Sequence, residues 1–240
     1  MANQYFKFKE FTVYQDMCAM KVCTDACLFG AYTAAMLQNN NTALQNCLDI
    51  GTGTGLLSLM LAQKTSVEAD AIEIDKAAFE QASRNFYHSP WKHRLKAFNT
   101  NAINFTLGKQ YQYIISNPPF FEGDLKSSND QKNAAKHDST LTHQQLLHTA
   151  SQLLLPGGTF AVLLPYKRVK NFIEIAEANG LYLVHKALVK QTPLHSFFRG
   201  MLYFTNQPSA ASKKEICIKD EMGDYTKRFT ELLYDYYLYL

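Results

Sequence analysis

The sequence predicts an α/β fold, a mostly parallel β-sheet with helices on both of its faces. Two observations predict it. Short apolar runs alternate with amphipathic segments of helical period from residue 47 to residue 180, and this alternation is typical of the βαβ units that build a parallel sheet. A glycine-rich stretch, "DIGTGTG" at 49–55, follows the first of these runs. It stands at a strand-to-helix turn, where α/β proteins bind their ligands.

The elements of the predicted sheet follow one another in a regular order. The expected strands are 47–50, 69–74, 94–98, 111–116 and 157–165, and the expected helices are 56–64, 76–87, 142–155 and 169–180. Two further β-rich runs, 181–191 and 199–206, are joined by a short connection around Pro193 and His195. Such a short connection indicates a closing antiparallel pair.

Smaller elements are expected near both ends. Residues 5–13 indicate a small hairpin, and Thr24 with Asp25 can cap a helix over 26–36. Residues 226–240 predict a helix whose apolar side chains recur at helical spacing; these are Phe229, Leu232, Leu233 and Tyr236. With 240 residues and 47% hydrophobic content, we expect one domain. In it, residues 1–45 form an N-terminal extension and 46–240 form the sheet that carries the candidate site.

The composition of the sequence indicates the cellular location and limits the kinds of partner to be expected. The first residues lack an apolar signal segment and no apolar run is long enough to span a bilayer, so we expect a cytoplasmic protein with no membrane partner. The five cysteines are odd in number and unevenly placed, which argues against a disulfide framework. No second ligand pair accompanies Cys23 and Cys27, so no metal site is expected. The net charge of +3 permits an anionic partner without indicating one.

The stretch 49–55 is the strongest candidate for a ligand-binding turn. Glycines at the carboxyl end of a parallel strand let a ligand approach the backbone closely. Their spacing is G-x-G-x-G instead of the G-x-G-x-x-G of dinucleotide sites, and an acidic residue precedes them, so the pattern moves away from NAD. The less favoured alternative is a turn that merely packs a helix on a strand. The candidate binding residues are Asp49, Gly51, Thr52, Gly53 and Gly55.

A second binding feature ends the next predicted strand. Glu73 in "IEID" stands 20 residues after Gly53, where a carboxylate can accept both hydroxyls of a ribose. The glycine turn and this acidic strand end together resemble those of class I S-adenosylmethionine-dependent methyltransferases. The resemblance implies a Rossmann-like fold with a mostly parallel seven-stranded sheet, a C-terminal antiparallel strand, and S-adenosyl-L-methionine as cofactor. It also implies that Asn101, at a position where the family often has aspartate, accepts from the amino group of the cofactor's adenine.

The stretch "IISNPPFF" ends another predicted strand with two adjacent prolines. "NPPF" at 117–120 resembles the (D/N)PP(Y/F) signature of enzymes that methylate exocyclic or amide nitrogens. The resemblance implies that the Asn117 side-chain oxygen and the Pro118 carbonyl accept from the target nitrogen. Pro119 keeps this turn rigid together with Pro118, and Phe120 stacks on the base. An ordinary strand-ending turn is the alternative.

The resemblance covers nearly the whole chain. The segments "CAMKVCTDACLFGAY", "DIGTGTGLLSLMLAQ", "SPWKHR", "IISNPPFF" and the final "YYLYL" are similar to those of the bacterial tRNA1(Val) adenine N6-methyltransferase family. This implies methylation of the adenosine 3′ of the anticodon, position 37, in tRNA1(Val), and a tRNA partner bound through its anticodon stem-loop. The polar segment 123–138, with Lys136 and His137, suggests a substrate loop. We expect a monomer.

Three alternatives stay open from the residues themselves. The same motif suits N5-methylation of a protein glutamine or N-methylation of another RNA, such as rRNA, and the fold also serves non-catalytic binding proteins. Only about 45 residues precede the glycine turn, too few for the separate helical substrate domain expected of glutamine methyltransferases. Basic residues are scattered, and pairs such as Lys7 with Lys9 and Lys213 with Lys214 are candidates for an RNA-binding face.

Overall fold

The computed structural model describes residues 3–18, 20–39, 45–119 and 141–240. Eight strands form one sheet in the order β10-β8-β9-β7-β6-β3-β4-β5. β9 is antiparallel to its neighbours β7 and β8, and the other neighbouring pairs are parallel. The strands are β3 (Asn46–Ile50), β4 (Glu68–Glu73), β5 (Leu95–Asn99), β6 (Tyr111–Ser116), β7 (Leu154–Pro165), β8 (Tyr182–Lys190), β9 (Phe197–Thr205) and β10 (Ser212–Cys217).

The mostly parallel sheet is confirmed, and an eighth strand adds to the seven expected. This strand, β10, pairs in parallel with β8 at the edge of the sheet. Its sequence, SKKEIC, is exposed at its first four positions, and exposed lysines on an edge strand discourage pairing with other chains. An edge strand of this kind lacks the apolar alternation by which the other strands were predicted.

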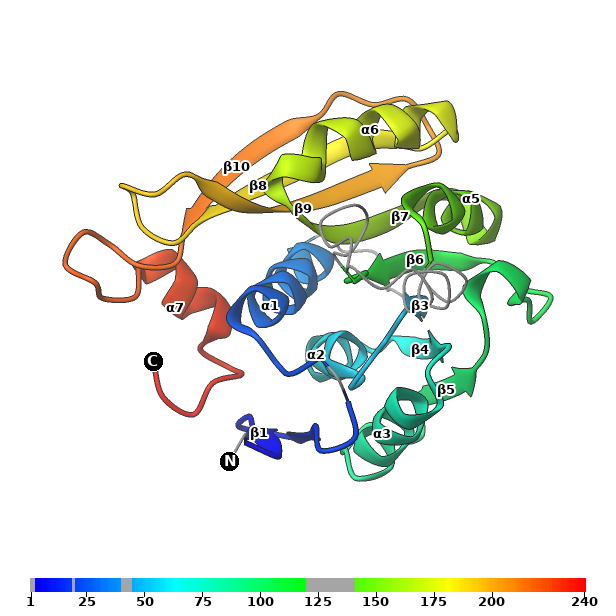
Figure 1. Cartoon of the computed structure of the whole chain (residues 1–240), viewed down its shortest axis with the longest axis horizontal. Helices are drawn as coiled ribbons and strands as arrows, with labels where there is room; N and C mark the ends of the chain where they lie inside the picture. Colours follow the sequence, from blue (N-terminus) through cyan, green and yellow to red (C-terminus); the bar gives the residue numbers. More distant parts are fainter. Residues whose placement is uncertain (1–2, 19, 40–44, 120–140) are drawn as a thin grey trace, which may run out of the picture.

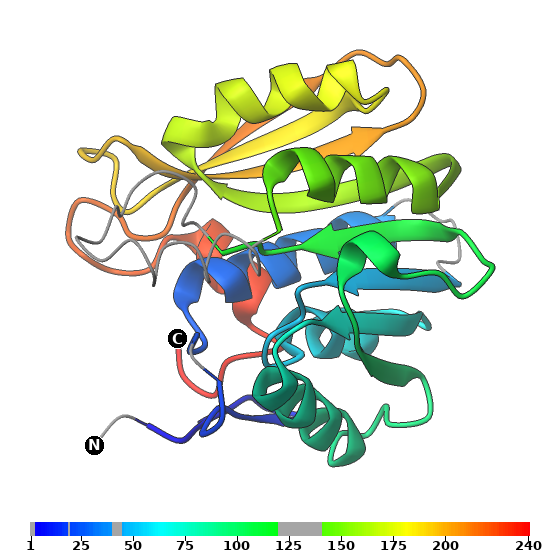
Figure 2. The same ribbon diagram turned by 45° about the vertical axis from the view of Figure 1, so that its right-hand side comes forward.

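Helices cover both faces of the sheet (Figures 1 and 2). The first face carries α1 (Thr24–Asn39), α2 (Leu56–Lys64) and α3 (Lys76–Tyr87), and the second carries α5 (His143–Leu153) and α6 (Val169–Ala178). Two short 3₁₀ turns, η1 (Ala102–Asn104) and η2 (Tyr166–Arg168), follow β5 and β7. Each face buries its own hydrophobic cluster, so the apolar residues of the strands are used on both sides, as expected of a parallel sheet.

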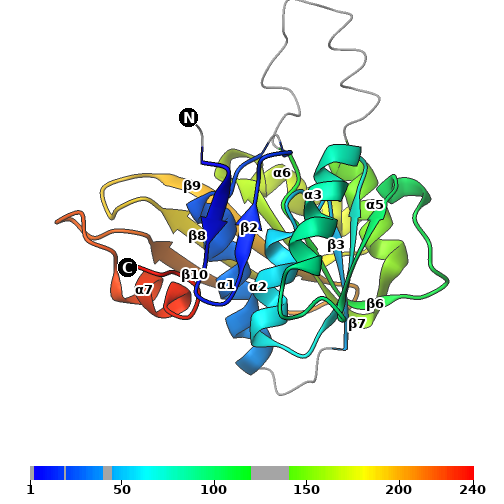
Figure 3. The same ribbon diagram turned by 90° about the horizontal axis from the view of Figure 1, so that it is seen from below.

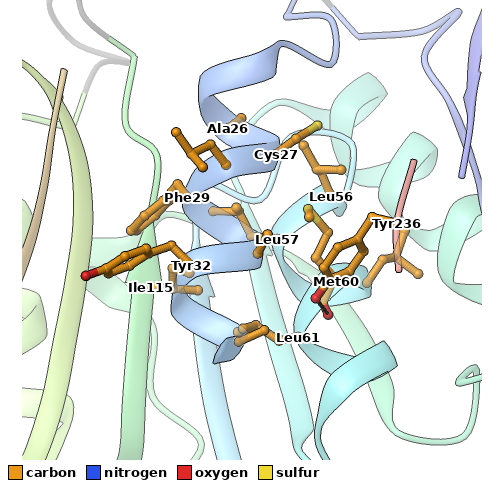
Figure 4. Close-up of a cluster of buried hydrophobic side chains, with 14 of the residues drawn as sticks. Ala26, Cys27, Phe29, Tyr32, Leu56, Leu57, Met60, Leu61, Ile115 and Tyr236 are labelled. Atoms are coloured by element: carbon orange, nitrogen blue, oxygen red, sulfur yellow. Dashed lines mark hydrogen bonds between the residues drawn. The ribbon is translucent and has the colours of Figure 1, made fainter. Parts of the chain in front are cut away.

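The helix α2 packs against α1 (Figure 4). Its residues 56–62 are all buried, and a helix that is buried on every side belongs to the interior of a fold. Gly30 of α1 permits the close approach, because a Cβ there would lie 2.7 Å from the Met60 sulfur. The Tyr236 hydroxyl donates to the Met60 carbonyl at 2.9 Å, which fastens the end of the chain to this layer.

The terminal segments lie on the same layer. α7 (Lys227–Leu233) is shorter than the helix expected over 226–240, and its predicted apolar stripe is buried as expected. The N-terminal hairpin is confirmed, and it consists of β1 (Tyr5–Lys7) and β2 (Thr12–Tyr14). Its second strand, β2, lies beside α3 (Figure 3). An isolated bridge pairs Phe8 with Tyr237. Within the described ranges, no helix has both the length and the apolar character needed to cross a membrane.

Parallel pairing sets where the site can form. β3 lies between β4 and β6 and runs parallel to both, with Ile50 opposite Ile72 on one side and opposite Ser116 on the other. The carboxyl ends of these three strands therefore meet at one edge of the sheet. From β3 the chain adds β4 and β5 on one side, and it then returns to add β6 on the other side of β3. Open α/β sheets bind their ligands at such a switch point.

Candidate active site

A cavity of about 810 Å³ opens at this edge. It brings together most of the site residues predicted from sequence. Those that line it are Gly51, Gly53, Glu73, Asn101, Asn117, Pro118 and Pro119. Phe120 and the predicted substrate loop at 123–138, including Lys136 and His137, lie outside the described residues.

The glycine turn presents bare backbone to the cavity. Gly51 and Gly53 have φ of +71° and +56°, and no atom lies within 4 Å of the position that a Cβ would occupy at either. Their positive φ favours glycine, and the open space above them allows a ligand to approach the main chain. Gly55 differs, because a Cβ there would lie 2.5 Å from the Phe86 ring. The packing role considered for the turn thus applies to Gly55.

Asp49 lies beneath the turn and does not line the cavity. One carboxylate oxygen, Oδ2, accepts from the hydroxyls of Thr52 at 2.7 Å and Ser58 at 2.8 Å. The other, Oδ1, is buried without a partner among the described residues. Burial raises the pKa of Asp49 from 3.8 to about 6, although the two hydroxyls lower it. Asp49 and Thr52 therefore shape the turn from below.

Glu73 lines the cavity beside the turn. Its Oε2 accepts from the Gly53 amide at 3.0 Å and its Oε1 accepts from the Asp75 amide at 3.0 Å. An ionised carboxylate offers about four lone-pair sites, so each oxygen keeps one for a ligand. The carboxylate thus fixes the turn and still presents two acceptors at the cavity.

Asn101 follows β5 and also has a structural task. Its Oδ1 caps η1 by accepting from the Ile103 amide at 3.0 Å. An amide oxygen has a second lone pair, so the predicted bond to an adenine amino group needs this oxygen to accept twice.

Asn117 directly follows β6 and lines the cavity. Its Oδ1 is buried and has no hydrogen-bond partner among the described residues. Buried polar atoms are nearly always paired, and an exception calls for an explanation. A donor on a bound ligand would satisfy this oxygen, since the residue lines the cavity.

Sequence reasoning missed the apolar part of the lining. Ile74 and Ile103 are exposed large hydrophobic residues at the cavity, and so are Met17 and Met20 from the N-terminal extension. Ile74 and Ile103 come just after the predicted site residues Glu73 and Asn101 at strand ends, and this position in the sequence could have predicted them. No local signal marks the methionines, because they reach the cavity through the tertiary fold. Among the described residues, no group of three or more potential metal-ligating side chains occurs.

Solved structures share this fold. A predicted O-methyltransferase from Agrobacterium tumefaciens superposes with a TM-score of 0.69 at 14% identity, covering 88% of this chain and 96% of that one. A putative RNA methyltransferase from Pyrococcus horikoshii does so with a TM-score of 0.55 at 19% identity, covering 75% and 82%. The fold is that of the class I methyltransferases.

Sequence comparison places the chain more narrowly. The family model for the methyltransferase small domain matches residues 29–176. A relative from Dyadobacter fermentans is 40% identical, with 98% of both chains covered. One from Pectobacterium carotovorum is 37% identical, covering 98% of this chain and 94% of the relative. Both are named tRNA1(Val) (adenine(37)-N6)-methyltransferase, and this chain belongs to their family.

The buried carboxyl of Asp49 generates a prediction about stability and pH. Because its pKa is about 6 in the folded protein against an ordinary value of 3.8, the folded state binds this proton more tightly than the unfolded chain. Its contribution to stability is therefore complete below the lower value and is lost as pH rises through the upper one. Asp49→Asn removes the titration and keeps an oxygen for both hydroxyls.

The measurement is urea unfolding of both proteins between about pH 4 and pH 8. The free energy of unfolding of wild type minus that of Asp49→Asn should fall between about pH 4 and pH 6 and then level off. Asp224→Asn, at an exposed carboxyl, controls for the substitution and should follow wild type. A difference that does not change with pH would contradict the raised pKa.

Proposed function

We propose that this protein transfers a methyl group from S-adenosyl-L-methionine to N6 of adenine 37 in tRNA1(Val). The observation that carries the proposal is the buried Oδ1 of Asn117 in the cavity lining, which has no hydrogen-bond partner among the residues that the structure describes. The family of the chain supports the choice of substrate, because relatives matched over nearly their full length carry this activity in their names.

The cavity residues fit the cofactor. S-adenosyl-L-methionine would supply an activated methyl group on a positively charged sulfur. The two free acceptor positions of Glu73 suit the ribose hydroxyls, and the open backbone at Gly51 and Gly53 suits close approach of the rest of the molecule. Ile74 and Ile103 offer apolar surface for the adenine ring.

Asn117 supplies what an amino group on a base lacks. The lone pair of adenine N6 is conjugated with the ring, so the nitrogen is a weak nucleophile. Asn117 Oδ1 and the Pro118 carbonyl would accept from its two hydrogens and favour a pyramidal nitrogen. Positive charge grows on N6 as the methyl group arrives, and fixed acceptors stabilise that charge. A base held this way must leave its stack, which costs least in an unpaired loop.

The register of the sheet suggests where RNA lies. Pro165 of β7 is opposite Arg199 of β9, and Lys190 of β8 is opposite Phe197. These residues lie at the same edge of the sheet as Asn117. Each strand is about 5 Å from the next one in the sheet. Phe197 contacts the ring of Tyr166 at 5.3 Å and the ammonium groups of Lys190 at 4.5 Å and Lys213 at 5.7 Å. Rings interleaved with cations suit flanking nucleotides, although Glu215 also pairs with both lysines.

A monomer is proposed as the working unit. An anticodon stem-loop is the part of tRNA that carries adenine 37 unpaired, so we propose it as the bound element. Such a substrate also favours a cytoplasmic location.

Removing the Glu73 carboxylate should weaken cofactor binding. Glu73→Ala leaves the ribose hydroxyls unpaired, so affinity for S-adenosyl-L-methionine should fall by about 1 to 3 kcal/mol. Calorimetry measures it, with urea unfolding as a check that the variant is folded. Glu68→Ala, at the exposed start of the same strand, is the matched control and should bind as wild type does. Unchanged affinity in folded Glu73→Ala would remove this residue from the site.

Removing the Asn117 oxygen should slow the chemistry and spare cofactor binding. Asn117→Ala deletes an acceptor used mostly in the transition state, so kcat on tRNA should fall by about 100-fold or more. Asn117→Asp keeps an acceptor and should recover part of the rate. Asn104→Ala, at an exposed position of η1, should have no effect. Near-normal turnover by Asn117→Ala would show that nitrogen methylation does not proceed in this way.

Binding of tRNA should depend steeply on salt through Lys190 and Lys213, whose ammonium groups lie beside the Phe197 ring. Replacing Lys190 and Lys213 together by glutamine should reduce the log-log salt slope by about one for each phosphate that these side chains neutralise. The control removes the same charge from Lys7 and Lys9 of the N-terminal segment. A flatter slope only in the control pair would move the RNA face to the hairpin. Methylation of glutamine-bearing protein fragments but not of tRNA would reject the RNA substrate.

A further inference from the structure

One wall of the cavity comes from the N-terminal extension. Met17 and Met20 line it, and these residues are 40% and 42% exposed. Large thioether side chains with this much open surface in a cavity offer contact area to a ligand. We call residues 14–18 and 20–22 the strap. The strap begins at Tyr14, the last residue of β2, and ends before α1, so its position at the cavity depends on the contacts that hold it.

A single buried amide on α3 holds the start of the strap. Asn85 Oδ1 accepts from the Tyr14 amide at 2.9 Å, and its Nδ2 donates to the Tyr14 carbonyl at 2.8 Å. The same Nδ2 donates to the Thr54 carbonyl in the glycine turn at 2.8 Å. Asn85 is only 1% exposed and does not line the cavity. It therefore joins strap, helix and glycine turn from behind.

A second amide one helical turn earlier holds the middle of the strap. Gln81 Oε1 accepts from the Met17 amide at 3.0 Å, and the side chain is fully buried. Its Nε2 has no partner among the described residues. Outside these amides, Arg84 approaches Asp16 at 3.4 Å and lies 4.7 Å from the centre of the Tyr14 ring. The face of α3 toward the strap is thus a row of polar anchors at helical spacing.

The strap also has an internal hydrogen bond, and it lies near the acidic residues Glu73 and Asp75. Gln15 Oε1 accepts from the Val22 amide at 2.8 Å, which closes the segment into a loop. Cys18 is buried, and this burial together with the charges of Glu73 and Asp75 raises the pKa of its thiol to about 11. These charges act on the thiol because the strap passes close to the carboxylate proposed to bind the ribose.

We propose that the strap is a wall of the cofactor site and that Asn85 is a positioning residue for cofactor binding. Asn85 places the strap and the glycine turn at a fixed separation, with Gln81 as the second anchor. The inference rests on the proposed function, because it takes the ligand of the cavity to be S-adenosyl-L-methionine. It requires that loss of Asn85 weakens cofactor binding while the reaction at saturating cofactor and the use of tRNA are preserved.

The kinetic test compares Asn85→Ala and Gln81→Leu with wild type, and Glu80→Ala on the exposed face of α3 is the control. Both anchor variants should raise the KM for cofactor and its Kd by tenfold or more. Their kcat and their KM for tRNA should stay within about twofold of wild type. A purely structural role of Asn85 would instead lower the amount of active protein and leave KM unchanged. Cofactor affinity within twofold of wild type in both folded variants, or a loss of kcat alone, would overturn the inference.

Hydrogen exchange on wild-type protein tests the wall without any substitution. S-adenosyl-L-methionine should slow exchange in the strap by tenfold or more, while β1 on the same N-terminal segment should be unaffected. Cofactor binding with no change in the strap would overturn the inference and leave the proposed function standing. Failure of wild type to bind the cofactor at all would reject the proposed function, and this inference with it.

Discussion

The glycine turn between β3 and α2 depends on one buried carboxylate. Asp49 holds Thr52 and Ser58 from below through a single oxygen, while the Gly51 and Thr52 amides donate to the Ile72 carbonyl of β4 at 2.9 and 3.1 Å. The turn is therefore fixed from beneath and from the neighbouring strand, and its upper surface stays bare. The other walls attach to it, Glu73 at the Gly53 amide and α3 through Asn85 at the Thr54 carbonyl.

Unpaired polar atoms gather around this site. Four buried side-chain atoms lack partners among the described residues, and three of them belong to Asp49, Gln81 and Asn117. Each such atom costs about 1 to 3 kcal/mol, so a fold optimised for stability alone would pair them. Of the three, only Asn117 lines the cavity, where its oxygen is open to a ligand donor. Asp49 lies beneath the glycine turn and Gln81 holds the Met17 amide, so their unpaired atoms belong to the supports of the site.

The sequence was informative where structure follows from local pattern. The apolar runs around β3, β4 and β6 and the motifs at their ends were predicted because strand, turn and glycine signals are local, and parallel pairing then brings Gly53, Glu73 and Asn117 to one edge. β10 was missed because its exposed polar residues resemble those of a loop. The strap, Gln81 and Asn85 were missed because Asn85 and Tyr14 are 71 positions apart, and a helical asparagine carries no sign of its partner. Asp49 and Thr52 belong to the predicted turn, yet only the structure shows that they lie beneath it.

The central claim is that the cavity and Asn117 together methylate one adenine. The most direct measurement incubates the purified protein with S-adenosyl-L-methionine and unmodified tRNA1(Val) transcripts that carry either adenosine or guanosine at position 37, followed by nucleoside mass spectrometry. The account predicts N6-methyladenosine in the first transcript and none in the second. Methylation at another position, equal methylation of both transcripts, or none in either would contradict it.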